Sequence, residues 1–325
     1  MTNTTSKKKK NVLFFGLIVV LIFCIGLVFV LFQDQEIKVE NGQESDYHVV
    51  EYNDKIYDFN SSIVSLLFMG IDTTDSEIMG QADSLQLYLL NRDTQSMHVL
   101  NISRDAMTKI HLFDMEHNDL GYDTQHINLA YAYGPDPKNG AMLTCEAVRK
   151  MLYDVPVNYF AAIDLSQLSS LHEVVQDLLV EVPNDSLVSV NPEWTKGSQV
   201  HITTENVESF VRTRDTGVDY SNQDRMERQQ AYLNAYFIKI KEMLSKDFDS
   251  TVSLLYNITK KMTTNVTLEN IETFSNMIMT YSYDPQSDFY ELPGENQVGP
   301  NHDEFVIDQK ELKKLVLQLF YKEGK

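Results

Sequence analysis

Two aspartates and an arginine stand at the ends of apolar segments that predict strands. The runs 85–90 and 97–102 predict a hairpin, because a short polar turn separates them. In a register centred on that turn, Asp83 and Arg104 face each other at the open end of the hairpin. Asp72 closes an earlier apolar run, and a short loop leads from it to Asp83. We therefore expect these three side chains at one edge of a sheet.

Carboxylates in that arrangement suit a hard divalent cation. Mg²⁺ takes oxygen ligands, keeps several waters and often bridges to a substrate phosphate. Asp72 and Asp83 are the candidate metal ligands on this interpretation. The structural alternative is a turn aspartate at position 72 and a strand cap at position 83.

Arginines are concentrated in a second segment. If 211–214 is a strand, Arg212 and Arg214 point to the same side, because side chains alternate along a strand. A predicted helix follows, and residues three and four apart share a face on it. That face carries Arg225, Arg228 and Gln229. The guanidinium fork matches phosphate oxygens, so the segment predicts a diphosphate site. Surface salt bridges with nearby acidic residues are the alternative.

Strands and helices alternate along the chain, which predicts an α/β fold. Further strands are expected at 64–69, 159–163 and 179–182. Helices are expected at 141–153, 166–177, 222–244, 252–258 and 309–321.

Charge and cysteine content exclude some classes of function. The chain has 325 residues and a formal net charge of −20 at pH 7, with 47 acidic against 27 basic residues. A domain this acidic repels the phosphates of nucleic acid, so we expect no nucleic-acid partner. The two cysteines, Cys24 and Cys145, predict no disulfide framework.

An uncharged apolar segment at 12–32 follows four lysines and precedes Asp34. It is long enough for a transmembrane helix, and the basic residues before it place the N-terminus in the cytoplasm. No small-residue cleavage pattern follows, so an uncleaved anchor in the cell membrane is favoured over a signal peptide. The predicted order is a cytoplasmic tail at 1–11, a single-pass anchor at 12–32, an extracellular linker at 33–62 and an extracellular domain at 63–325.

Several short segments resemble, in the same order, the motifs of the LytR–CpsA–Psr family. An ordered series over about 65–236 is far more specific than any one of its members. The lysine-flanked anchor also fits that family. The matching segments are 67–72, 80–84, 102–105, 127–134, 156–160, 211–214 and 225–230.

The resemblance implies a three-layer α/β/α sandwich with a central mixed sheet, preceded by one N-terminal transmembrane helix. It implies a phosphotransferase that moves a phosphate-linked glycopolymer, such as teichoic acid or capsular polysaccharide, from polyprenyl diphosphate onto peptidoglycan. A hydrophobic pocket would hold the polyprenyl tail, and Mg²⁺ would bind to the aspartates of two motifs.

Roles are carried over by motif position. The metal carboxylates would be Asp72 and Asp83. The diphosphate ligands would be Arg104, Arg212, Arg214 and Arg225, with Arg228 and Gln229 in support. The catalytic group would be Arg104, Asp105 and Asp83, in which Asp105 or a metal-bound carboxylate accepts the proton of the acceptor hydroxyl.

The chain departs from the family pattern at several positions. Gln81 stands where the family has an arginine, Ser103 where it has a proline and Leu129 where it has a histidine. Two alternatives to a transferase remain. One, motivated by the loss of a phosphate-binding arginine, is a non-catalytic lipid-diphosphate-binding scaffold for wall assembly. The other is a polyprenyl-diphosphate phosphohydrolase, in which water replaces the sugar acceptor.

Overall fold

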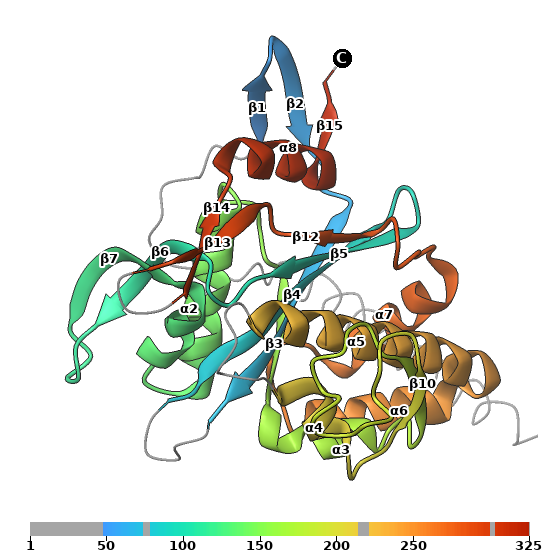
Figure 1. The fold of residues 1–325 in the computed structure, drawn as a ribbon. Coiled ribbons are helices and arrows are strands. Elements are labelled where there is room, and N and C mark those ends of the chain that lie inside the picture. The colour runs from blue at the N-terminus through green and yellow to red at the C-terminus, as the bar shows by residue number, and fades with distance from the viewer. Residues whose placement is uncertain (1–47, 74–78, 214–220, 300–302, 325) are drawn as a thin grey trace, which may run out of the picture. The chain divides into compact units, whose positions relative to one another are not determined.

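The computed structural model describes residues 48–73, 79–213, 221–299 and 303–324 (Figure 1). No helix within these ranges is long and apolar enough to cross a membrane. The predicted anchor at 12–32 and the basic tail before it lie outside the described residues.

A six-stranded mixed sheet forms the centre of the fold, in the order β11-β8-β3-β4-β5-β12. β3 pairs antiparallel with β4 and parallel with β8, and β12 pairs parallel with β5. The predicted hairpin and its register are confirmed, because Leu85 of β4 faces Ile102 of β5. The strands are Ile63–Asp72 (β3), Gln81–Asn91 (β4), Ser96–Ile102 (β5), Tyr159–Asp164 (β8), Thr263–Thr264 (β11) and Phe289–Glu291 (β12).

The helices begin at polar residues that cap them. The Asp136 side chain accepts a hydrogen bond from the N–H of Asn139, and Asp308 accepts from the N–H groups of Lys310 and Glu311. These bonds satisfy backbone donors that a helix leaves without internal partners. The α-helices are Pro137–Met151 (α2), Leu168–His172 (α3), Val207–Arg212 (α4), Ser221–Lys246 (α5), Phe248–Thr259 (α6), Leu268–Thr280 (α7) and Gln309–Phe320 (α8).

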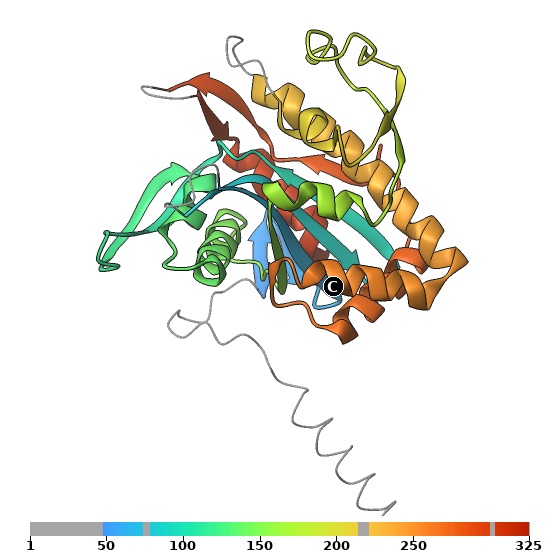
Figure 2. The ribbon, with the colours of Figure 1, turned by 90° about the horizontal axis from the view of Figure 1, so that it is seen from below.

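Helices cover both faces of the sheet (Figure 2). Side chains alternate along a strand, so one strand serves two cores. Leu67 and Met69 of β3 enter a core that also holds buried residues of α2 and α8. Phe68, between them, packs against a second core that holds residues of α3, α4, α5 and α6. This arrangement has the layers that the predicted sandwich requires.

The predicted linker contains part of the fold. Val49–Tyr52 (β1) and Lys55–Phe59 (β2) lie within 33–62, and β2 pairs with Tyr321–Glu323 (β15) near the end of the chain. The N–H of Asn60 also donates to the carbonyl of Phe320. The folded domain therefore starts before residue 63, because β1 and β2 form a local hairpin whose apolar side chains, among them Val50, Tyr57 and Phe59, pack against the first core.

Two other segments differ from expectation. The helix predicted at 166–177 is short, since only α3 is α-helical there and Gln176 has a φ of 64°. The strand predicted at 179–182 forms as Leu178–Glu181 (β9), but it pairs with Gln199–Ile202 (β10) outside the central sheet. Two more hairpins flank the sheet: Met107–Phe113 (β6) with Asp119–His126 (β7), and Gly294–Val298 (β13) with Asp303–Ile307 (β14).

Candidate functional site

A β-bulge at the end of β4 sets the position of Asp83. Gly70 of β3 faces Ser84, but the next residue, Ile71, faces Ala82, so Asp83 is the extra residue of the bulge. A bulge breaks the regular alternation of side chains and can redirect one of them. The bulge therefore lies at Asp83, the residue that contacts two arginines of the site.

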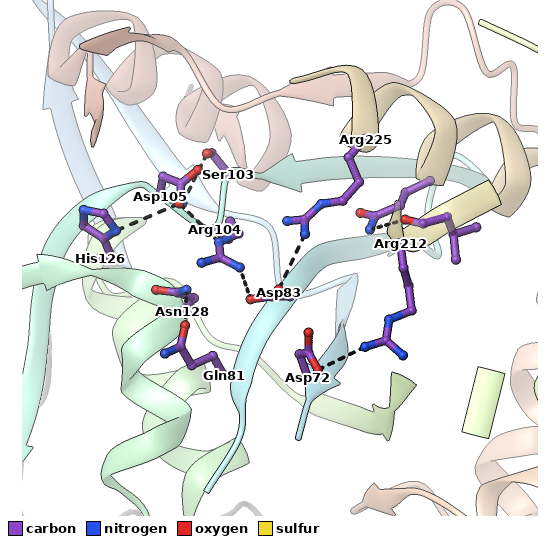
Figure 3. Close-up of polar contacts among 12 residues, drawn as sticks. Asp72, Gln81, Asp83, Ser103, Arg104, Asp105, His126, Asn128, Arg212 and Arg225 are labelled. Atoms are coloured by element: carbon purple, nitrogen blue, oxygen red, sulfur yellow. Dashed lines mark hydrogen bonds and ion pairs between the residues drawn. The ribbon is translucent and has the colours of Figure 1, made fainter. Parts of the chain in front are cut away.

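Asp83 joins two arginines that come from different parts of the chain (Figure 3). Its Oδ1 accepts a hydrogen bond from Nη1 of Arg104, which follows β5. Its Oδ2 lies 3.6 Å from Nη1 of Arg225 on α5. Asp83 is 7% exposed, so these charges interact with little screening by water. The predicted pairing of Asp83 with Arg104 is confirmed.

Arg104 also contacts its neighbour in sequence. Nε of Arg104 donates to Oδ1 of Asp105 at 3.2 Å, and Nδ1 of His126 lies 3.9 Å from the same oxygen. The N–H of Asp105 donates to Oγ of Ser103, so the residue that replaces the family proline holds this turn by a side-chain hydrogen bond. The Arg104 side chain is 20% exposed and can be reached by a ligand.

Arg212 lies at the end of a helix, and the strand predicted at 211–214 is wrong over its described part. Val207, Phe210 and Val211 are buried at helical spacing, which favours α4 over an extended segment. Nη2 of Arg212 donates to Oδ1 of Asp72 at 3.2 Å, which brings Asp72 into the same site. Arg214 lies outside the described residues.

Arg228 and Gln229 hold the end of α4. Arg228 is fully buried, and its guanidinium donates to the carbonyls of Phe210 and Thr213 and to Oγ of Ser186. Nε2 of Gln229 donates to the carbonyl of Val211. These bonds satisfy carbonyls that the helix end leaves without partners. Burial lowers the pKa of Arg228 to about 10, with repulsion from Arg225 in the same direction, so it remains charged at neutral pH.

Asp164 extends the acidic edge of the site. Thr73 Oγ1 donates to its Oδ2, and the N–H of Ser166 donates to its Oδ1 at 2.7 Å. Burial opposes ionisation, but these hydrogen bonds and the charge of Arg212 together lower the pKa of Asp164. Asp164 is therefore anionic at neutral pH and lies at the end of β8, next to β3.

Gln81 occupies the place of the family arginine and makes a neutral contact there. Nδ2 of Asn128 donates to Oε1 of Gln81 at 2.9 Å. Asn128 is 1% exposed, and its Oδ1 has no hydrogen-bond partner among the described residues. A buried amide with an unsatisfied acceptor is costly unless another group completes it. The N–H of Asn128 also donates to the carbonyl of Arg104 at 3.3 Å, which places this amide next to Arg104 (Figure 3).

An apolar cavity of about 40 Å³ opens between the sheet and α5. Its walls include Gly70 and Ser84, close in sequence to Asp72 and Asp83, and Val211, which precedes Arg212. The rest is mainly aliphatic and aromatic: Phe68, Ile163, Leu165, Leu168, Leu171, Tyr232 and Leu233. The apolar cavity therefore borders the cluster of charged side chains.

Among the described residues, no group of three or more His, Cys, Asp or Glu side chains is arranged to hold a metal. The carboxylates of Asp72 and Asp83 still have the donor chemistry for Mg²⁺, which is often held by one or two carboxylates together with substrate phosphate and water. Both are paired with arginines in the structure. A bound cation would have to share these carboxylates with the arginines.

The structure brings most of the predicted site residues to one edge of the sheet: Asp72, Asp83, Arg104, Asp105, Arg212 and Arg225. Arg228 and Gln229 do not join this group, because their side chains bond to backbone carbonyls of α4. Sequence reasoning assigned no role to Asn128 or His126, although both lie in or next to a segment that resembles a family motif. Asp164 was missed too, and its place directly after a predicted strand was the available signal.

Comparisons with known proteins identify the family and the fold of the chain. The model of the LytR_cpsA_psr family matches residues 28–320. A polyisoprenyl-teichoic acid–peptidoglycan teichoic acid transferase, TagU, of Bacillus cereus is 29% identical over 217 residues, which are 65% of this chain and 63% of the relative. TagU of Bacillus subtilis is 28% identical over 233 residues, with 69% and 70% covered. The chain thus spans under two thirds of the length of the first of these relatives.

Solved structures share the fold. B. subtilis TagV superimposes with a TM-score of 0.63 at 21% identity, covering 79% of this chain and 96% of that one. TagT bound to LIIa-WTA gives a TM-score of 0.60 at 23% identity, covering 86% and 95%. At this level of identity the likeness concerns the fold alone.

Proposed function

The chain belongs to the LytR–CpsA–Psr family, and we propose that it transfers a phosphate-linked glycopolymer from a polyprenyl-diphosphate carrier to peptidoglycan. The observation that carries the proposal is the convergence of Arg104, Arg212 and Arg225 on one sheet edge beside an apolar cavity. A diphosphate joined to a hydrocarbon chain matches these two surfaces. Teichoic acid, named for the TagU relatives, is the polymer class we favour.

The reaction we propose is a phosphoryl transfer. An acceptor hydroxyl attacks the sugar-proximal phosphorus, the new P–O bond forms, and the bond to polyprenyl phosphate breaks. Polyprenyl phosphate leaves, and the hydroxyl proton passes to Asp105, which lies beside Arg104. The arginines stabilise the charge that develops on the phosphate oxygens. No ATP is required, because the diphosphate is already activated.

We place the polyprenyl tail in the apolar cavity and the chain in the cell membrane through 12–32, with its folded domain outside. The donor lipid is itself embedded in the membrane, so an anchored domain meets it at high local concentration. A cavity of about 40 Å³ is narrow for a hydrocarbon chain, so it must widen when the lipid enters.

Charge balance within the site supports a divalent cation. Three arginines are matched by Asp72, Asp83 and Asp105, and Asp164 adds a fourth negative charge, so the described cluster has no net positive charge to offer a diphosphate. We propose that Asp72 and Asp83 hold Mg²⁺, which would neutralise phosphate charge there. Repulsion between the donor and the aspartates would then fall.

Removal of divalent metal is expected to lower the transfer rate by about 100-fold. Full-length protein is treated with EDTA and assayed before and after Mg²⁺ is restored; Ca²⁺ should restore less, because it prefers longer and more numerous oxygen ligands. Asp72→Asn should raise the Mg²⁺ concentration needed for half-maximal rate. Transfer that persists in metal-free protein at the original rate would contradict a role for Mg²⁺.

Narrowing the apolar cavity is expected to discriminate between donors by tail length. Leu165→Trp adds bulk at the cavity wall and should raise KM about tenfold for a long polyprenyl donor, since each buried CH₂ contributes about 0.8 kcal/mol. A donor with a short tail should be affected much less. Leu179→Trp on β9, at a 53% exposed leucine outside the cavity, is the matched control. Equal effects on both donors would place the tail elsewhere.

One assay separates the transferase from its alternatives. Full-length protein in detergent receives a polyprenyl-diphosphate-linked sugar and a wall-glycan acceptor, and released lipid phosphate and joined sugar are measured together. Release with joining supports the transferase. Release without joining, at any acceptor concentration, supports the phosphohydrolase, and tight donor binding with no release supports the scaffold.

A further inference from the structure

A second cavity, of about 210 Å³, lies beside Ser103, the residue before Arg104. Its walls come from the end of β5, the first turns of α5, the segment from β12 into β13, and β14. Glu291, Gln223 and Phe305 are among the lining residues. The cavity shares no lining residue with the apolar cavity, so the charged cluster has a separate space on its β12 side.

The chemistry of this second cavity is that of a neutral polar ligand. Two carboxylates, Glu291 and Glu295, and two amides, Gln223 and Asn296, offer hydrogen bonds, and the Phe305 ring offers an apolar face. None of its lining residues in the described part of the chain is an arginine or a lysine. Carboxylates without a cation repel an anionic diphosphate, whereas sugar hydroxyls donate readily to them.

Glu291 is held in place by the sheet. β12 pairs with β5 so that Glu291 faces Asn101, and Nδ2 of Asn101 donates to both carboxylate oxygens, at 3.0 and 3.3 Å. Asn101 is 5% exposed, whereas Glu291 is exposed to solvent and lines the cavity.

The cavity wall is tied directly to Asp105. The N–H of Phe305 donates to the carbonyl of Asp105 at 2.8 Å, and the N–H of Asp105 donates to Oγ of Ser103. Gly294 allows this packing: a Cβ there would lie 2.6 Å from the Phe305 ring and 2.4 Å from the carbonyl of Val306. The lining residues Ser103 and Phe305 therefore hold the backbone of Asp105, the residue to which the proposed reaction assigns the acceptor's proton.

We propose that this cavity binds one sugar ring of the acceptor glycan, with Glu291 accepting a hydrogen bond from a ring hydroxyl and Phe305 contacting the apolar face of the ring. This assignment rests on the proposed transfer reaction and names the place of its second substrate. A volume of about 210 Å³ is below the range of about 300–1,000 Å³ for pockets that enclose drug-sized ligands, which suits a single ring.

Kinetics with two substrates test the site. Glu291→Gln should raise KM for a wall-glycan acceptor about tenfold, because it removes a charge-assisted hydrogen bond, while KM for the donor stays within about twofold. Glu304→Gln, the same change on β14 but outside the cavity, should leave both values unchanged. Phe305→Leu should also raise KM for the acceptor. An unchanged KM for the acceptor in both cavity variants would overturn the assignment.

Binding without donor separates this site from the transfer reaction itself. A tetramer of N-acetylglucosamine is added to full-length protein, and saturation-transfer NMR measures its binding to wild type, Glu291→Gln and Glu304→Gln. Binding that is weakened only by Glu291→Gln supports the site even if no transfer is ever observed, in which case the proposed function fails alone. Equal binding to all three proteins overturns the site even if transfer is active.

Discussion

Arg104→Ala is expected to lower kcat for glycopolymer transfer by about 100- to 1,000-fold, the loss typical when one preorganised donor to a developing negative charge is removed. Arg104 contacts Asp83 on one side and Asp105 on the other, so it fixes both carboxylates as well as facing the proposed phosphate position. Two arginines contact Asp83. The Arg104 side chain is partly exposed and can be reached by a ligand, whereas Arg225 is only 7% exposed.

Arg104→Lys separates charge from geometry. Lysine keeps the positive charge but lacks the planar fork, so it should recover only part of the rate, about tenfold over the alanine variant. Arg149→Ala is the matched control. Arg149 forms an ion pair of 2.7 Å with Asp154, outside the site, so its removal should leave kcat unchanged. Thermal unfolding of each variant checks that the fold is intact. A folded Arg104→Ala protein with kcat within threefold of wild type would remove Arg104 from the mechanism.

The central hairpin was predictable because two local signals agree. Its strands are short, mostly apolar runs, as expected for a sheet that is buried on both faces, and the polar turn between them fixes the register by its length. Asp83 and Arg104 then follow at the open end, where the structure has them in contact. The bulge at Asp83 was not predictable, since it depends on how β3 pairs across Gly70 and Ile71.

Two other errors arose where composition or charge spacing was given more weight than the apolar pattern. The segment that contains β1 and β2 is acidic as a whole, which favoured a linker, yet Val50, Tyr57 and Phe59 pack against the core, and β2 pairs with both β1 and β15. The pattern of arginines at 212 and 214 resembled a strand on one face, yet the burial of Val207, Phe210 and Val211 follows a helix. The spacing of these apolar residues, three and four positions apart, predicts a helix and is a stronger signal than the spacing of the two arginines.

Arginines that look alike in sequence have different tasks in the structure. Arg225 and Arg228 share one helix face, but Arg225 points to Asp83 while Arg228 turns to the carbonyls at the end of α4. The second arginine thereby sets the position of Arg212, the residue that pairs with Asp72. The diphosphate role first predicted for Arg228 gives way, in our proposal, to a positioning role.

Arg228→Met is expected to destabilise the domain by about 3 kcal/mol, because it leaves one buried and two half-buried acceptors without their donor, and each loss of a buried partner costs about 1–3 kcal/mol before relaxation. A loss of that size lowers Tm by roughly 6–10 °C in a domain of this length. Because α4 would lose its anchor, donor KM should rise even at temperatures where the variant is folded. Calorimetry and donor kinetics at low temperature measure the two effects separately.

Arg92→Met is the matched control for that change. Arg92 also donates to two backbone carbonyls, those of Ser61 and Ser62, but it does so at the exposed surface, where water can replace the lost donor. Its Tm should fall by no more than about 2 °C, and its kinetics should match wild type. Similar losses of stability in both variants would mean that burial of Arg228 contributes nothing beyond its hydrogen bonds. A destabilised Arg228→Met protein with unchanged donor KM would separate Arg228 from the positioning of Arg212.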